Sequence, residues 1–371
     1  IQTVMADSCW VPGYIGDSII LGILDTGIDS SHPALSGKVI KWRDFINNLP
    51  YPYDDHGHGT AGAGVICGGD GFGPFTDDIG VAPGVKLVVA KMFASSGVPY
   101  VDPIYGLQWM ASLKADSGFN IRAINNAWGG NITTHFWEVC NTLKALEILP
   151  VFSIGNSGPN PSTTCSPGNY PLVLGLGATN FSDSIANFSS RGPAPDSIPW
   201  NNSVYWYRAD WNLIKPDLTA PGVSVRTSWT NHQYSILNGT SFATAHATGA
   251  IAILCEKNPV LPIEEIYNIL LDNTDHPAQG APYPNNNYGW GRLNVWKALQ
   301  AVIGVEEQEI KFVTNDFVLP TIVRGPLYLP QHARVTVFDI SGRKVVPPYL
   351  APGVYFIETD EKIIQKIIVL K

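Results

Sequence analysis

The stretch that decides the fold is Asn238-Gly-Thr-Ser-Phe-Ala-Thr-Ala-His-Ala-Thr-Gly-Ala-Ile-Ala-Ile-Leu-Cys255, a polar turn that opens into small and apolar residues. A helix without charge is surrounded by protein, so this pattern predicts a buried helix at the centre of a large domain. Ser241 would lie at its N-terminus, where unpaired N–H groups and the helix dipole favour an anion. Read alone, however, the stretch favours a simple N-cap role for Thr240 or Ser241.

Length and composition narrow the class of protein. The 371 residues are enough for one large domain and a smaller one. Only 15% of the residues are charged, while Gly (36), Pro (29) and Trp (11) are plentiful, which indicates a rigid, loop-rich, secreted domain. The net charge of −8 and the lack of a basic run argue against nucleic acid as a partner. The longest apolar runs are too short for a membrane span.

Two further stretches carry candidate functional residues. The apolar run Ser18–Leu24 predicts a strand buried on both faces, and it ends in Asp25, at the sheet edge where open α/β sheets bind ligands. Asp25 could equally cap the next turn or bind a ribose. In Asp54-Asp-His-Gly-His-Gly-Thr-Ala-Gly-Ala-Gly64, His58 begins a second helix of small residues. Isolated histidines are more often structural, and that interpretation applies to the remaining candidates: His32, His56, His135, His232, His246 and His276.

Strand and helix patterns alternate along the first 303 residues. The predicted strands are 86–93, 123–130 and 150–154, and the predicted helices are 102–115 and 135–146. This alternation predicts an α/β domain with a doubly wound parallel sheet. From Gly304 the pattern changes to short alternating strands with Pro and Gly turns. We therefore expect a large α/β domain over 1–303 and a small all-β sandwich over 304–371.

The three motifs Asp25-Thr-Gly, His58-Gly-Thr and Gly239-Thr-Ser241, in this order, resemble the catalytic motifs of the subtilisin family of serine peptidases. The loops are most similar to the bacillopeptidase F-like members. The resemblance implies that Ser241 is the nucleophile, His58 the general base and Asp25 the residue that orients the imidazole. It further implies an oxyanion hole made by the Asn156 side chain and the backbone N–H of Ser241. Asn156 could instead be a turn residue, since Gly-Asn-Ser-Gly is good turn chemistry.

The same resemblance assigns substrate-binding segments. An edge strand that pairs with an extended peptide corresponds to Ala127, Trp128, Gly129 and Gly130. The primary pocket would be walled by that strand, by Ser153, Ile154 and Gly155, and by the loop before Tyr170. These segments carry no charge, so we expect an uncharged or aromatic side chain before the scissile bond. Trp128 could instead serve only as wall packing.

Several positions depart from the family pattern. Ala34 stands where a calcium-binding Asp is common, and a long loop before Gly80 is missing, so the usual tight calcium site is expected to be absent and no cofactor is required. Calcium elsewhere stays open because Asp70, Asp77 and Asp78 share one loop. Phe242 replaces a common Met after the nucleophile, and Ala245 replaces a common Pro.

The five cysteines lack the spacing of a zinc site. The family's fold places Cys140 and Cys165 on elements that flank one strand, which makes them a candidate disulfide. Two buried thiols are the alternative. Cys67 and Cys255, both in predicted buried helices, are expected to be core thiols.

The predicted function is a secreted or cell-surface serine endopeptidase acting on proteins or peptides. A narrow processing peptidase and an inactive binding module are the alternatives. Because the chain starts at Ile1 and not at Met, removal of an N-terminal propeptide is expected. The tail 305–371 closely resembles the C-terminal domains that direct bacterial proteins through the type IX secretion machinery, and a purely stabilising β-domain is the alternative.

Overall fold

The computed structural model describes residues 1–70, 78–99, 101–303, 322–324, 335–347, 350–359 and 364–370. The chain divides into two compact units, Ile1–Gly304 and Val305–Lys371.

A seven-stranded parallel sheet organises the first unit, with the strand order β2-β3-β1-β4-β5-β6-β7. The strands are β1 (Ile20–Asp25), β2 (Val39–Asp44), β3 (Lys86–Lys91), β4 (Ile121–Asn126), β5 (Leu149–Ser153), β6 (Leu174–Thr179) and β7 (Leu218–Pro221). Apart from the edge strand β2, nearly all their residues are buried, as expected when helices cover both faces of a sheet. The predicted α/β doubly wound sheet is confirmed.

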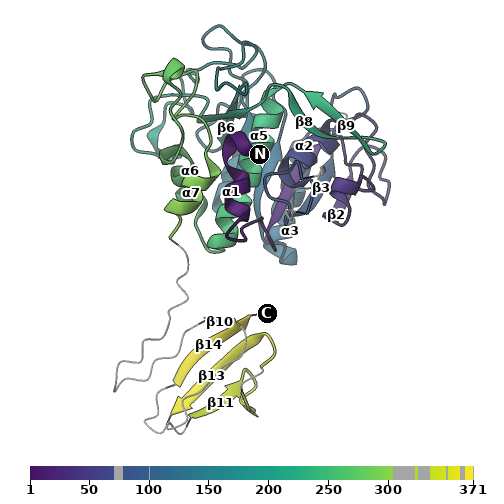
Figure 1. Ribbon diagram of the computed structural model, residues 1–371, viewed down its shortest axis with the longest axis vertical. Helices are drawn as coiled ribbons and strands as arrows, with labels where there is room; N and C mark the ends of the chain where they lie inside the picture. Colours follow the sequence, from purple (N-terminus) through teal and green to yellow (C-terminus); the bar gives the residue numbers. More distant parts are fainter. Residues whose placement is uncertain are drawn as a thin grey trace. The chain divides into compact units, whose positions relative to one another are not determined.

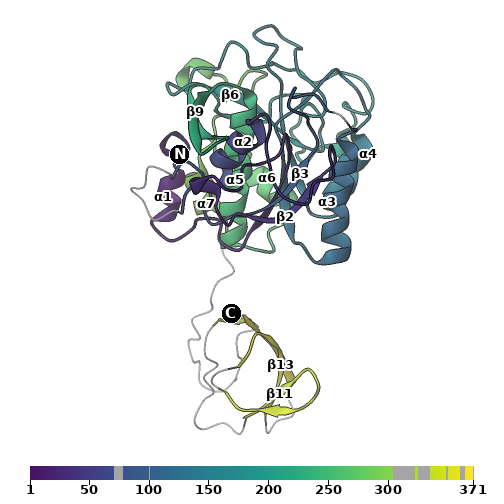
Figure 2. The same cartoon turned by 90° about the vertical axis from the view of Figure 1, so that its right-hand side faces the viewer.

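Helices cover the two faces of this sheet. On one face, α2 and α5 belong to one buried hydrophobic cluster, and on the other face α3 and α4 contribute to a second. Figure 2 shows these two pairs of helices on opposite sides of the sheet. The helices are α1 (Ala6–Trp10), α2 (His58–Cys67), α3 (Ile104–Ser117), α4 (Trp137–Ala145), α5 (Thr240–Lys257), α6 (Ile263–Asp272) and α7 (Val295–Ala301). Short 3-10 turns cover Gln2–Val4, Pro33–Leu35, Ser203–Tyr205 and Ala278–Gly280.

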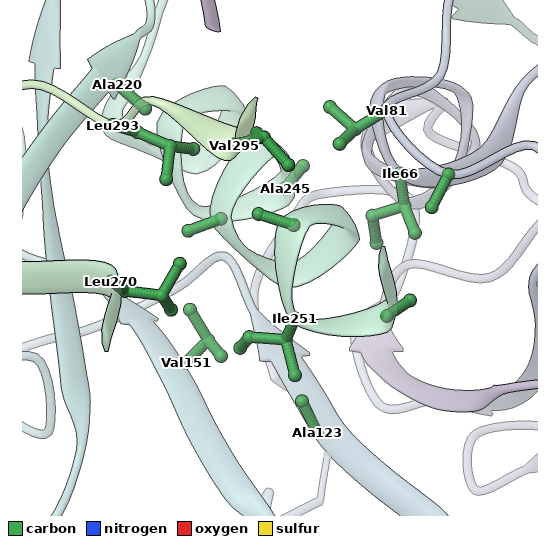
Figure 3. Packing of buried hydrophobic residues seen from close by; sticks show 14 of the residues in the cluster. Ile66, Val81, Ala123, Val151, Ala220, Ala245, Ile251, Leu270, Leu293 and Val295 are labelled. Atoms are coloured by element: carbon green, nitrogen blue, oxygen red, sulfur yellow. The ribbon is translucent and has the colours of Figure 1, made fainter. Parts of the chain in front are cut away.

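Helix α5 is the centre of the first unit, as its lack of charge predicts. Its residues from Thr240 to Cys255 are all buried. Ala245 and Ile251 pack among Ile66 of α2 and Val151 of β5 (Figure 3). Small side chains let the neighbouring elements approach this helix closely, so its N-terminus, which carries Ser241, is held by packing on every side.

A two-stranded hairpin, β8 (Val225–Trp229) and β9 (Gln233–Leu237), packs against α2. Thr227 Oγ1 donates to the Ala61 carbonyl at 2.7 Å, and Ser228 Oγ donates to the Thr60 carbonyl at 2.8 Å. The hairpin therefore holds the first turns of the helix that begins at His58.

The second unit is an all-β domain. Its described strands are β10 (Ile322–Arg324), β11 (Val335–Asp339), β12 (Lys344–Val345), β13 (Gly353–Thr359) and β14 (Ile364–Leu370). They form one sheet in the order β10-β14-β13-β11-β12, antiparallel except where β10 joins β14. Val337, Tyr355 and Ile357 belong to a small core of its own. The predicted all-β class is confirmed, and the described strands lie in a single sheet.

The predicted disulfide between Cys140 and Cys165 is wrong, because both thiols are free. Cys140 is buried in an aromatic cluster with Phe152 and Tyr170. Cys165 instead directs its thiol to the carbonyl of Ser153, the last residue of β5, at 3.6 Å. Burial raises the pKa of Cys165 to about 12, which keeps it a neutral thiol. Cys67 and Cys255 are buried in α2 and α5, as expected for core thiols.

Candidate active site

The carboxyl end of β1 and the first residue of α2 bring Asp25 and His58 together. His58 Nδ1 lies 2.8 Å from Asp25 Oδ1, which also accepts from the Thr26 backbone N–H at 2.7 Å. Asp25 is only 2% exposed, so its charge acts through protein and not through water. With its proton on Nδ1, the imidazole presents Nε2 as an acceptor.

Opposing effects set the protonation of His58. Burial alone lowers the pKa of the imidazole, but the charge of Asp25, the hydrogen bond to it and the charge of Asp54 together raise it. A base whose pKa lies somewhat above the ordinary histidine value takes up a proton readily near neutral pH. The Asp25–His58 pair is therefore suited to general acid–base work.

Ser241 is the second residue of α5 and is nearly buried. Its hydroxyl donates to the Ala127 carbonyl at 3.0 Å, so in this rotamer the proton points along the segment that follows β4. The ring of Phe242 lies 6.1 Å, centroid to centroid, from the ring of His58. Since Phe242 directly follows Ser241, this ring contact places the start of α5 beside the start of α2.

Asn156 lies on the exposed loop after β5, beside the start of α5. Its Oδ1 accepts from Thr240 N at 3.0 Å and from Thr240 Oγ1 at 2.9 Å. These two bonds fix the orientation of the amide, so that Nδ2 faces away from Thr240 and keeps its protons for another acceptor. The N-terminus of α5 and this amide together offer donors to a developing negative charge.

The segment Ala127–Gly130 continues beyond the end of β4. Gly130 N donates to the Ser166 carbonyl at 2.9 Å in an isolated antiparallel bridge. Trp128 is surrounded by Phe93, Phe136 and Phe152, with ring centroids 5.8, 5.3 and 5.1 Å away. Trp128 therefore packs as part of a wall, one of its two predicted roles.

The predicted pocket segments converge beside this wall. A Cβ built on Gly129 would lie 2.4 Å from Cys165 Sγ, and one on Gly155 would lie 3.2 Å from the same atom. Ser153 and Ile154, which precede Gly155, are buried. The segments 127–130 and 153–155 therefore approach the same thiol, and the residues that line this region are uncharged.

Comparison with known proteins decides the family. The profile of the Subtilase family matches residues 16–291. The chain belongs to the subtilase family. Bacillopeptidase F of Bacillus subtilis (strain 168) is 30% identical over 368 residues, which span 91% of this chain and 24% of that protein. Subtilisin DY of Bacillus licheniformis is 31% identical over 304 residues, which span 81% of this chain and 97% of that protein.

A solved protein structure has the same fold as this chain. The crystal structure of a cold adapted subtilisin-like serine proteinase has a TM-score of 0.61 at 24% identity and covers 76% of this chain and 90% of that chain. By its family match, and as its three motifs predict, the chain is a subtilisin-like serine endopeptidase. The chain spans about a quarter of the length of bacillopeptidase F.

The six histidines that the sequence assigns to structural roles have partners in the structure. His32 and His276 bond to the carbonyls of Gln233 and Trp290, and His246 bonds to the Phe242 carbonyl within α5. The exposed pair His135 and Asp102 meets at 2.5 Å, His232 contacts Ser31, and His56 Nδ1 accepts from His58 N. The ring of each of these six histidines thus has a hydrogen-bond partner, in agreement with the structural roles that the sequence favours for them.

The calcium prediction falls partly outside the described residues, because Asp77 lies there. Asp70 and Asp78 meet through a hydrogen bond of 2.9 Å from Asp70 N to Asp78 Oδ1. Within the described ranges, no group of three or more His, Cys, Asp or Glu side chains is arranged to hold a metal. Calcium binding stays a prediction. The helices of the described residues include none that is both long and apolar enough to cross a membrane.

Two polar residues of the site were not singled out from the sequence. Asp54 and Thr26 hydrogen-bond to the backbone at the start of α2 and to each other. Asp54 lies in the motif quoted above. The sequence signal for its role is the glycine at position 57, which has no side chain to cap the helix, so that another residue must supply the cap. The partners of Asp54 come from residues up to 28 positions away, which no local pattern reveals.

Proposed function

We propose that the chain hydrolyses peptide bonds of protein substrates through an acyl-enzyme intermediate on Ser241. The observation that carries the proposal is the 2.8 Å contact of His58 with Asp25, facing the start of α5. A serine hydroxyl is a poor nucleophile until a base removes its proton, and this arrangement supplies the base. Rotation about the Ser241 side chain from the Ala127 carbonyl toward Nε2 completes the triad.

In the first step, Ser241 Oγ attacks the scissile carbonyl carbon while His58 Nε2 takes up the hydroxyl proton. Asp25 stabilises the imidazolium and holds its Nδ1–H in place. The oxyanion of the tetrahedral intermediate accepts hydrogen bonds from Asn156 Nδ2 and the Ser241 backbone N–H. Collapse breaks the C–N bond, and the amine leaves with the proton from His58. Water then repeats the sequence on the acyl-enzyme and releases the acid.

The specificity we propose is broad, with an uncharged side chain before the scissile bond. Support comes from the uncharged residues of the converging segments and from the segment 127–130, which the family resemblance assigns as the strand that pairs with the peptide. Backbone pairing reads the shape of an extended peptide more than its sequence. A narrow processing role would follow instead from strong preferences beyond this position, and a cleavage-site profile on a peptide library separates the two.

The test of activity uses Ser241→Ala and a serine-directed phosphonate. The purified chain should hydrolyse casein and take up one equivalent of phosphonate, and Ser241→Ala should do neither while it keeps its melting temperature. An intact chain that neither cleaves nor labels would favour an inactive binding module. Retained casein cleavage by Ser241→Ala would remove Ser241 from the chemistry.

We further propose that the chain is exported and that its second unit serves as a sorting domain. Support comes from the tail's resemblance and from its small separate core. A type IX machinery would then be a partner. Deletion of residues 305–371 should leave casein hydrolysis unchanged and retain the protein in the periplasm of a host with that machinery. Normal export of the truncated chain would refute this role.

A further inference from the structure

Helix α2 begins without a capping side chain of its own. Its N-cap is Gly57, which has φ +109° and makes no side-chain hydrogen bond. A side chain there is excluded, since a Cβ on Gly57 would lie 2.5 Å from the ring of Trp229. The N–H groups of the first turn are strong donors that need acceptors. His58 is the first residue of this helix, so whatever holds the first turn also holds the imidazole.

A single carboxylate holds that turn from outside. Asp54 accepts five hydrogen bonds, three at Oδ1 from Thr26 Oγ1, His56 N and Gly57 N, and two at Oδ2 from Thr60 N and Thr60 Oγ1. Their lengths run from 2.7 to 3.1 Å. Charge-assisted bonds of this kind are about twice as strong as neutral ones.

Thr26 links this carboxylate to the Asp25–His58 contact. Its hydroxyl accepts from Gly59 N at 2.9 Å and donates to Asp54 at 2.9 Å, while its backbone N–H donates to Asp25. The residue beside Asp25 and the residue after His58 are thus tied together through Asp54.

We propose that Asp54 is a positioning residue for catalysis, which holds His58 in register with Asp25 and supplies a second negative charge to the imidazolium. The inference rests on the proposed function, since it concerns the same base. Asp54 touches neither the serine nor the substrate in this scheme and acts through α2.

The charged and titratable groups around His58 come from three elements. Asp25 ends β1, Asp54 and His56 precede α2, and the ring of His56 lies 6.2 Å from that of His58. Next to Thr26, the buried Lys91 of β3 donates to the Thr26 carbonyl and pairs with Asp55 at 2.5 Å. From α5 the neighbouring ring, Phe242, is uncharged. Asp54 is therefore a carboxylate near His58 whose charge no described lysine or arginine pairs with.

The experiment replaces Asp54 by Asn in the full chain, which removes the charge at nearly constant shape. With a peptide p-nitroanilide, kcat should fall about ten- to a hundredfold with KM nearly unchanged, because a misplaced base weakens the transition state. The acid limb of kcat/KM should move to lower pH, since the imidazolium loses a stabilising charge. The matched control is Asp29→Asn. This variant loses the same charge on the neighbouring loop. The Asp29 carboxylate accepts hydrogen bonds from Ser31 and Asn231, which are not part of the first turn of α2.

Two further measurements keep the proposal open to refutation if Asp54→Asn does not fold. Thr26→Val removes the bridging hydroxyl and keeps every charge, so kcat should fall without the shift of the acid limb, and Thr26→Ser should restore kcat. In a Ser241→Ala background, NMR titration of the His58 ring reads its pKa without any turnover, so an error in the proposed function is told apart from an error here. Equal kcat and equal His58 titration in Asp54→Asn and Asp29→Asn would overturn the proposal, as would full kcat in Thr26→Val.

Discussion

Replacement of Asn156 by Ala tests whether the loop after β5 stabilises the transition state. The side chain does two separate things. Its Oδ1 accepts the two bonds from Thr240, and its Nδ2 is the proposed oxyanion donor. The substitution removes both, so it should change stability and catalysis by different, separately measurable amounts.

The stability loss follows from Thr240, which is fully buried. Without Asn156, its backbone N–H loses its acceptor, which costs about 1–3 kcal/mol for a buried donor. At roughly 2.1 cal/mol/K per residue, the unfolding entropy of the unit Ile1–Gly304 is about 0.6 kcal/mol/K, so the melting temperature should fall by about 2–5 °C.

The catalytic loss should be larger. Removal of the equivalent donor in subtilisin, a relative of this chain and the protein in which the effect was measured, lowers kcat about 10²- to 10³-fold. We expect the same range here, with KM nearly unchanged, because the oxyanion exists only beyond the ground state. Steady-state kinetics on a peptide p-nitroanilide and calorimetric melting measure the two effects.

Asn156→Asp separates them. A carboxylate keeps the acceptor for Thr240 and suits the N-terminus of α5, so the melting temperature should stay close to that of the native chain. The donor is lost and a negative charge faces the oxyanion, so kcat should fall at least as far as in Asn156→Ala. A rise in KM with unchanged kcat in both variants would mean that Asn156 binds substrate, and the oxyanion assignment would be refuted.

Three other outcomes can be checked on the same protein. Peroxide should spare activity that it destroys in a Phe242→Met variant, because only the thioether forms a polar sulfoxide beside Ser241; equal inactivation would contradict this. Lys215→Met leaves the fully buried Asp217 carboxylate without the ammonium group that lies 2.6 Å from it, at a cost of about 3–5 kcal/mol. The melting temperature should therefore fall by about 5–8 °C, and an unchanged melting temperature would refute the argument. The acid limb of kcat/KM should lie above pH 6.5, because the carboxylates raise the pKa of His58 beyond that ordinary value and the base must be neutral; a limb below it would show that burial dominates.

The central elements could be predicted because their signals are local. The apolar run before Asp25 forms a strand, and Asp25 is the last residue of that strand. The run of small residues after Gly57 forms a helix that begins at His58. The charge-free stretch from Thr240 became α5 with a difference of two residues at its end. In each case one continuous pattern decides both the element and the position of the side chain at its end.

Strand β6 was not predicted, and its sequence shows why. Leu174-Gly-Leu-Gly-Ala-Thr179 has two glycines, which weaken a strand signal. In the structure a Cβ on Gly175 would lie 2.2 Å from the Gly168 carbonyl, and one on Gly177 would lie 2.9 Å from Pro216. Tight contacts with residues outside the strand require these glycines, and the pattern of the strand itself carries no information about those contacts.

The prediction of a disulfide between Cys140 and Cys165 was wrong for a related reason. Spacing along the chain does not say toward which side of a strand a side chain turns, and Cys165 turns to the Ser153 carbonyl while Cys140 joins the aromatic cluster. A disulfide needs Cβ vectors that face each other.

The requirement for glycine at position 57 and the presence of a carboxylate at position 54 have one physical origin. The hairpin β8–β9 places Trp229 against the backbone of Gly57, and the positive φ there disfavours any side chain. The helix that carries His58 therefore cannot take its cap from its own N-cap residue. Asp54 supplies that cap from the preceding loop, and it brings a negative charge near the imidazole at the same time. Close packing of the hairpin and the electrostatics of the base are thus linked: any change that loosens Trp229 from Gly57 should also disturb the hydrogen bonds of Asp54, and through them the alignment of His58 with Asp25.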